Sequence, residues 1–95
     1  MIKHVVCFKL FDKTANAEKA KEILLSMQGN VPLLRGIEVG IDKLGSPRSY
    51  DVMLTVLLDD MQALSDYQVD PYHVDVVKKF MYAVTEKSVT MDYEV

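Results

Sequence analysis

Tryptophan is missing from this 95-residue sequence, and cysteine occurs once, as Cys7. A single thiol excludes an internal disulfide, and no cysteines and histidines follow the spacing of a structural zinc site. A domain this small often depends on disulfides, a metal or a partner subunit for its stability. Because hydrophobic residues make up 49% of the chain, we expect the additional stabilisation to come from a second subunit.

Arginine is also scarce: only Arg35 and Arg48 occur, the lysines are scattered, and the net charge is −3. Phosphate binding needs a clustered basic face, so the composition argues against nucleic acid as a partner. No apolar run is long enough to cross a membrane, and the first ten residues lack the core of a signal peptide. We therefore expect a soluble cytoplasmic protein with one domain over residues 1–95 and no membrane partner.

Alternating hydrophobic residues predict four strands, over residues 2–10, 35–42, 48–58 and 87–93. Helical spacing and capping residues predict three helices, which cover residues 15–28, the segment from Asp59-Asp60 to Tyr67, and the segment from Asp70-Pro71 to about Val84. The order is strand, helix, strand, strand, paired helices, strand. This order predicts an α+β, ferredoxin-like split βαβ fold, in which a four-stranded antiparallel sheet carries helices on one face.

The opposite face of this sheet is predicted to be partly apolar. It carries Val5, Cys7, Met53, Thr55 and Leu57, mixed with Glu38 and Thr90. An uncovered apolar surface predicts an interface, and two such sheets packed face to face would form a symmetric homodimer, a dimeric α+β barrel. The alternative is a monomer whose open sheet face is partly apolar.

His73 falls in the first turn of the last predicted helix and shares its inner face with Val77, Phe80 and Val84. A helix N-terminus disfavours positive charge, so we expect a neutral His73 with one nitrogen free to accept a proton. A general base must be in this state. The alternative is a core histidine that is satisfied by a backbone carbonyl or by Tyr67.

Two further side chains complete the candidate site. Tyr67 lies six residues before His73, and its hydroxyl can donate to an oxyanion or remain a packing residue. His4 lies on the core-facing side of the first predicted strand. We expect His4, Tyr67 and His73 to line a ligand pocket, with His73 and Tyr67 as a hypothetical catalytic pair. Two histidines without a carboxylate on the same face make a poor metal site, so no metal and no other cofactor is predicted.

Several short segments, spread over nearly the whole chain, carry a family resemblance. They are His4-Val-Val-Cys-Phe-Lys-Leu10, Val31-Pro32, Val39-Gly40, Ser49-Tyr50-Asp51-Val52 and Asp66-Tyr67-Gln-Val-Asp-Pro71-Tyr-His73-Val. In this order, and above all in the spacing Tyr-x-x-x-Pro-x-His, the chain resembles the stress-responsive dimeric α/β-barrel (Dabb) family. The resemblance implies a ferredoxin-like monomer, a homodimer formed through the sheets and, as for most members, no established activity.

The resemblance also suggests roles for the candidate residues. In a plant cyclase of this family that works by aldol condensation, the proposed catalytic His and Tyr correspond by motif to His73 and Tyr67, and a supporting His corresponds to His4. This chain has Val52 and Asp70 where that enzyme has histidines.

Four functions stay open at this point. The first is binding of a small apolar or carbonyl ligand without turnover, and the second is cofactor-independent acid–base catalysis on a small carbonyl compound. The third is a cofactor-free or haem-degrading monooxygenase. The absence of tryptophan and the presence of only two histidines weaken this alternative. The fourth is a purely structural dimerisation module.

Overall fold

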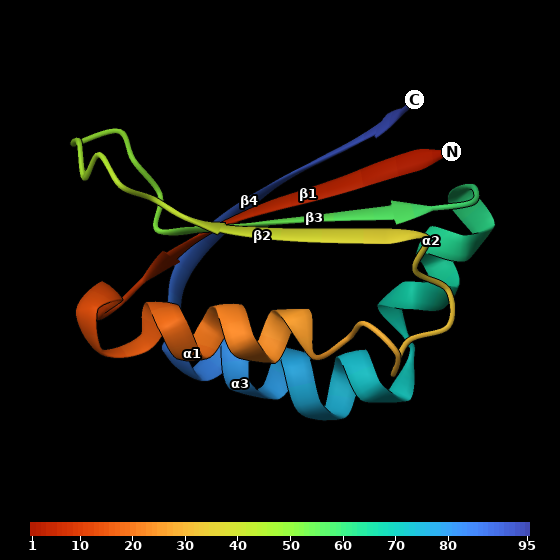
Figure 1. Ribbon diagram of the computed structural model, residues 1–95, viewed down its shortest axis with the longest axis horizontal. Coiled ribbons are helices and arrows are strands. Elements are labelled where there is room, and N and C mark those ends of the chain that lie inside the picture. Colours follow the sequence, from red (N-terminus) through yellow and green to blue (C-terminus); the bar gives the residue numbers. More distant parts are fainter.

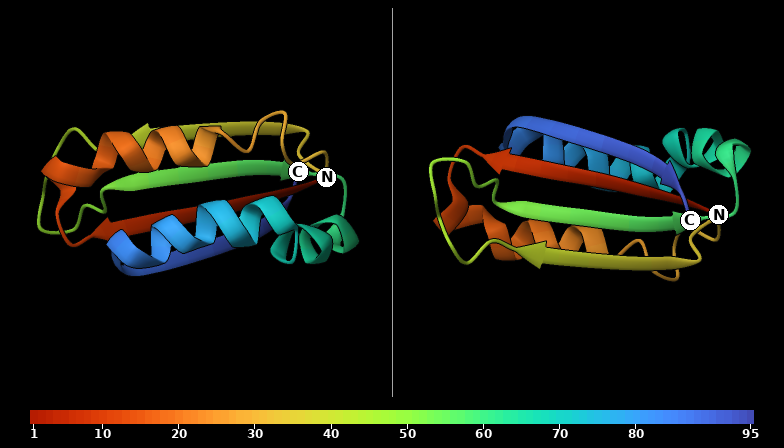
Figure 2. Two further views of the ribbon diagram at one scale, coloured as in Figure 1. Left: turned by 90° about the horizontal axis from the view of Figure 1, so that it is seen from below. Right: turned by 90° about the horizontal axis from the view of Figure 1, so that it is seen from above.

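Four strands form one antiparallel sheet in the computed structural model, which describes residues 1–95 (Figure 1). The strands are β1 (Ile2–Leu10), β2 (Gly36–Ile41), β3 (Val52–Leu58) and β4 (Thr85–Glu94), and their spatial order is β2-β3-β1-β4. All helices pack against the same face of this sheet (Figure 2). The predicted α+β, ferredoxin-like fold with helices on one face is confirmed.

Helices α1 (Lys13–Leu25) and α2 (Met61–Gln68) both begin at aspartate caps. The Asp12 carboxylate accepts a hydrogen bond from the backbone N–H of Ala15 at 3.0 Å, and the Asp60 carboxylate accepts one from Ala63 at 2.8 Å. These bonds satisfy backbone donors that the first helical turn leaves free. α1 begins two residues earlier than the helix predicted over residues 15–28 and ends three residues earlier. It ends early because turns begin after Leu25, and Gly29 has a φ of 86°.

The last helical segment carries His73, and part of it is a π-helix. Its N-terminus is capped by Asp70, whose carboxylate accepts hydrogen bonds from the backbone N–H groups of Tyr72 at 2.9 Å and His73 at 3.1 Å. A short α-helical turn is followed by the π-helix η1 (His73–Lys78) and then by α3 (Lys79–Val84). The predicted start and end of this segment are confirmed, whereas the π-helix was not predicted.

The hydrophobic core fills the space between the sheet and the helices. Its largest fully buried side chains come from all layers of the fold: Tyr67, Leu24, Met27, Leu58, Val31, Val52, Val56 and Val77. Along the last helical segment, His73, Val77 and Met81 are all buried and lie four residues apart. This row confirms that His73 points inward with the core, while Phe80 and Val84, predicted on the same face, are only half-buried.

Two details of the predicted strands are wrong. β3 begins at Val52 rather than at residue 48, because a turn precedes it, in which Ser46 N–H donates to the Ser49 hydroxyl oxygen at 3.0 Å. Thr90 does not lie on the open face, because it pairs with Val6, whose side chain faces the helices. Side chains alternate along a strand, so Thr90 belongs to the core-facing side of β4.

The open face of the sheet is nevertheless apolar over much of its area. On β4, Val89, Met91 and Tyr93 alternate with Thr90 and lie on the opposite face of the strand, where they are 50%, 66% and 39% exposed. They pair with Cys7, Val5 and Lys3 of β1. No helix covers this side of the sheet (Figure 2, right), so these apolar side chains of β4 are left exposed.

Candidate functional site

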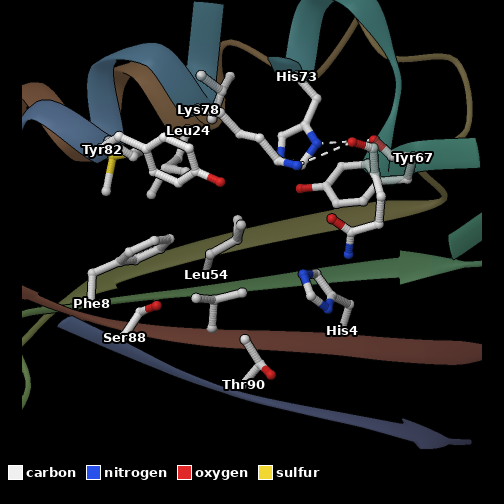
Figure 3. A pocket seen from close by; sticks show the side chains of 14 residues that line it. His4, Phe8, Leu24, Leu54, Tyr67, His73, Lys78, Tyr82, Ser88 and Thr90 are labelled. Atoms are coloured by element: carbon white, nitrogen blue, oxygen red, sulfur yellow. Dashed lines mark hydrogen bonds between the residues drawn. The ribbon is translucent and has the colours of Figure 1, made fainter. Parts of the chain in front are cut away.

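A cavity of about 200 Å³ lies between the sheet and the last helical segment (Figure 3). β1 and β4 contribute side chains on one side of it, and η1 and α3 on the other. Eight of its fourteen lining residues are hydrophobic, and the lining as a whole is His4, Val6, Phe8, Leu24, Leu54, Tyr67, Gln68, His73, Val77, Lys78, Met81, Tyr82, Ser88 and Thr90. The fold therefore brings His4, Tyr67 and His73 to one cavity, although His4 is far from the other two in sequence.

His4 is held by a carboxylate from the neighbouring strand. Its Nδ1 forms a hydrogen bond with the side chain of Asp92, which lies opposite His4 in the β1–β4 pairing. A carboxylate can only accept, so Nδ1 carries the proton. In the neutral ring Nε2 is then the acceptor, and it has no hydrogen-bond partner within the chain.

Tyr67 lies between the two imidazole rings (Figure 3). Its ring stacks on that of His73 with centroids 4.1 Å apart and meets that of His4 edge-on at 5.7 Å. The side chain is fully buried, and its hydroxyl donates to Sδ of Met27 at 3.6 Å. Burial, with a smaller contribution from the negative charge of Asp70, raises the pKa of the Tyr67 hydroxyl far above its usual range. Tyr67 can therefore donate a hydrogen bond but cannot serve as a base.

His73 is anchored by the backbone at the end of α2. Its Nδ1 donates to the carbonyl oxygen of Tyr67 at 2.9 Å, which fixes the proton on that nitrogen because a carbonyl can only accept. Burial lowers the pKa of His73, and the nearby positive charge of Lys78 lowers it further, against the raising effect of the Tyr67 carbonyl. The neutral state expected from the sequence is thus favoured, with Nε2 unprotonated and without a hydrogen-bond partner in the chain.

This arrangement brings the Nε2 atoms of two histidines, which have no partner in the chain, beside a buried phenol. Each imidazole is held by its Nδ1 proton, one through a carboxylate and one through a backbone carbonyl. Such anchoring fixes the ring orientation and leaves Nε2 as the reactive atom. The site can accept hydrogen bonds or a proton from a bound molecule whose body lies against the apolar walls.

Sequence reasoning missed several residues of the cavity. Ser88 and Thr90 of β4 line it, opposite Phe8 and Val6. Asp92 lies on the same side of the strand, opposite His4, but outside the lining. Placing Thr90 on the open face, as predicted from the sequence, puts the alternation of β4 one residue out of phase with the observed pairing. Lys78 and Tyr82 also line the cavity, and the π-turn before them displaced the helical period that would have identified them.

Two wider properties of the chain bear on the site. Nowhere do three or more His, Cys, Asp or Glu side chains come together in a group that could hold a metal ion. None of the helices has the length and apolar character needed to cross a membrane.

Comparison with solved structures places the same fold in proteins from several organisms. A dimeric protein of unknown function with a ferredoxin-like fold from Bacteroides fragilis NCTC 9343 is 27% identical, with a TM-score of 0.84 over 99% of this chain and 95% of that one. A Dabb family protein with a ferredoxin-like fold from Mesorhizobium loti is 22% identical, with a TM-score of 0.74 over 99% and 95%. A hydroxynitrile lyase from Passiflora edulis is 15% identical, with a TM-score of 0.80 over 99% and 92%.

Sequence comparison identifies the family more directly. Curated protein sequences contain no significant match to this chain. The family model described as the stress responsive A/B barrel domain matches residues 2–95, which is nearly the whole chain. This match agrees with the resemblance carried by the segments around His4 and from Tyr67 to His73. The chain belongs to the stress responsive A/B barrel domain family.

Proposed function

We propose that this protein is a homodimer that binds a small molecule in the cavity lined by His4, Tyr67 and His73. The observation that carries the proposal is the combination of apolar walls with two histidine Nε2 atoms that have no partner in the chain. Binding sites for small molecules are concave, mostly apolar and equipped with a few converging polar groups. The ligand that fits this description has an apolar body and a hydroxyl or carbonyl group.

The homodimer is proposed from the open face of the sheet. Val89 and Met91 are 50% and 66% exposed there, and exposed apolar patches of this kind mark interaction surfaces. The Bacteroides fragilis relative is described as dimeric. Burying the same patch of two copies against each other is an isologous arrangement, the commonest one for soluble oligomers.

Because the one cysteine forms no disulfide, a reducing compartment such as the cytoplasm is the proposed location.

Protein-observed NMR can test ligand binding with a matched pair of probes, 1-phenylethanol and acetophenone. The alcohol can donate a hydrogen bond to His73 Nε2, whereas the ketone cannot. We expect saturable shifts of amide signals around the cavity, such as those of Val6 and Thr90, with both probes. In the His73→Asn variant the amide nitrogen can still donate to the Tyr67 carbonyl, but the Nε2 acceptor is gone. The alcohol should then bind up to about tenfold more weakly, and the ketone with little change.

The control for this experiment is Val76→Ala, which changes an exposed residue of the same π-helix. It should leave binding of both probes unaltered. If neither probe shifts the cavity amides of the wild-type protein, the proposal of a ligand-binding cavity is wrong.

Acid–base catalysis on a small carbonyl compound is the second candidate function. It is supported by the neutral state of His73, whose anchored ring leaves Nε2 as a base, and by the enzymatic description of the Passiflora edulis relative. In this mechanism His73 removes a proton and Tyr67 donates to the developing oxyanion, which requires its hydroxyl to turn away from Met27. Positioned proton transfer contributes about 10²–10⁴-fold to rate. A turnover rate that the His73→Asn change leaves intact would contradict this mechanism.

A further inference from the structure

Lys78 is the one residue with a full charge in the lining of the cavity. The other lining residues are hydrophobic, hydroxyl-bearing or amide side chains and the two histidines. Elsewhere in the chain, lysines near the sheet have acidic partners: Lys9 pairs with Asp51 at 3.4 Å and Lys13 with Asp42 at 3.5 Å. Lys78 has no such partner. A half-buried cation without an acidic partner can attract an anion that enters the cavity.

The π-helix explains how this charge comes to lie near His73. In an α-helix, residues five apart are separated by about 140° around the axis, so Lys78 would point well away from His73. A π-helix bonds residue i to residue i+5, and η1 spans His73–Lys78. The wider turn brings the two side chains to the same side of the helix, where both line the cavity (Figure 3).

The ammonium group of Lys78 retains hydrogen-bonding capacity. Its Nζ donates to the backbone carbonyl of Gln68 at 3.1 Å and makes no other hydrogen bond in the chain. An ammonium has three N–H donors, so two are left for a ligand. Lys78 as a residue is half-buried, and in this environment a charge-assisted bond is stronger than at an open surface.

We infer that Lys78 binds a carboxylate, and that the ligand of the cavity is a small apolar carboxylic acid. The carboxylate accepts hydrogen bonds from Lys78 Nζ, while the apolar body lies between Phe8, Leu54 and Met81, which line the same cavity. A hydroxyl on this body, where present, donates to His73 Nε2. This inference rests on the proposed function, because it names the class of ligand for the same cavity.

Binding of hexanoate and of its neutral analogue hexanamide tests the inference, measured by protein-observed NMR on the full chain. The wild-type protein should bind hexanoate about tenfold more tightly than hexanamide, a factor that one charge-assisted hydrogen bond supplies. In Lys78→Met this preference should disappear, with the affinity for hexanamide unchanged. Lys78→Arg should restore it. Lys79→Met, which removes an exposed lysine of the same helical segment, should keep the wild-type preference.

The possible failures are distinguishable. If both probes bind the wild-type protein equally well, the ligand-binding cavity stands and the role of Lys78 is wrong; Lys78 then serves only to cap α2 through Gln68. If the preference persists in Lys78→Met, another group selects the acid, and the inference is overturned. If neither probe shifts the cavity amides, the proposed function and this inference are both contradicted.

Discussion

At the scale of single residues, the histidines are held in similar ways by different partners. His73 donates through Nδ1 to a backbone carbonyl that belongs to Tyr67, and His4 donates through Nδ1 to the carboxylate of Asp92. Tyr67 separates the two rings and contacts both. A change in one residue of this group should therefore alter the orientation of its neighbours.

The lowered pKa of His73 predicts a pH dependence of stability. The folded state holds His73 neutral, whereas the unfolded chain binds a proton near the ordinary histidine pKa of about 6.5. At a pH below the pKa of the unfolded chain, the unfolded state binds more protons than the folded state. The stabilisation that is present above this pKa is therefore lost as the pH falls through the folded-state pKa. Urea denaturation between pH 8 and about pH 5 should show a steeper loss for the wild-type protein than for His73→Asn. Parallel curves would contradict the buried neutral state.

The contact between His4 and Asp92 predicts a specific loss of stability. Asp92→Ala leaves the Nδ1 proton of the buried His4 without a partner, which costs about 1 kcal/mol or more. Glu94→Ala is the matched control, because Glu94 is exposed and lies two residues further along the same strand. Urea denaturation at pH 7 should separate the two variants. Equal midpoints for both would show that Asp92 does not stabilise His4.

At the scale of elements, the last helical segment determines the geometry of the site. Its start could be predicted from the sequence, because Asp70 followed by Pro71 is a typical helix N-terminus. Its π-turn could not, because the i+5 hydrogen bonds of η1 leave no signal in a hydrophobic pattern only a few turns long. Tyr67 precedes this turn and His73 begins it, so their inward placement could be predicted. Lys78 and Tyr82 lie at its end and beyond it, so their place in the cavity lining could not.

The cap of this segment offers a test at the same scale. Asp70→Ala removes the acceptor for the backbone N–H groups of Tyr72 and His73, which should lower the free energy of unfolding by about 1 kcal/mol. Asp70→Ser retains a capping oxygen and should recover most of this loss. Thermal or urea denaturation of the two variants measures the difference. An alanine variant as stable as the serine variant would mean that the cap contributes nothing.

β4 illustrates the second limit on prediction from sequence. Its pairing with β1 puts Thr90 and Asp92 on the cavity side and Val89 and Met91 on the open side. Apolar residues usually mark the core-facing side of a strand, but here the more apolar side is the exposed one. The rule fails because both faces of this strand are predicted to be covered, one by helices and the other by a second subunit.

At the scale of the whole molecule, the open face predicts a dimer that a charge should disrupt. Met91→Lys places an ammonium group on the apolar open face, where it would be buried and unpaired in the dimer. Met61→Lys makes the same change at a residue that is 59% exposed and belongs to helix α2 instead of the sheet. Sedimentation analysis should find a monomer for the first variant and a dimer for the second. Identical masses for the two variants would place the interface elsewhere.

The central claim is that a dimer holds a small molecule in the cavity of each subunit. Native mass spectrometry of the freshly purified wild-type protein and of His73→Asn, each before and after incubation with hexanoate, tests it most directly. The account predicts a wild-type dimer that carries a small-molecule adduct, either retained from purification or acquired from hexanoate, and a variant dimer that carries less of it. A wild-type protein that is monomeric and takes up no adduct in either condition would contradict the account.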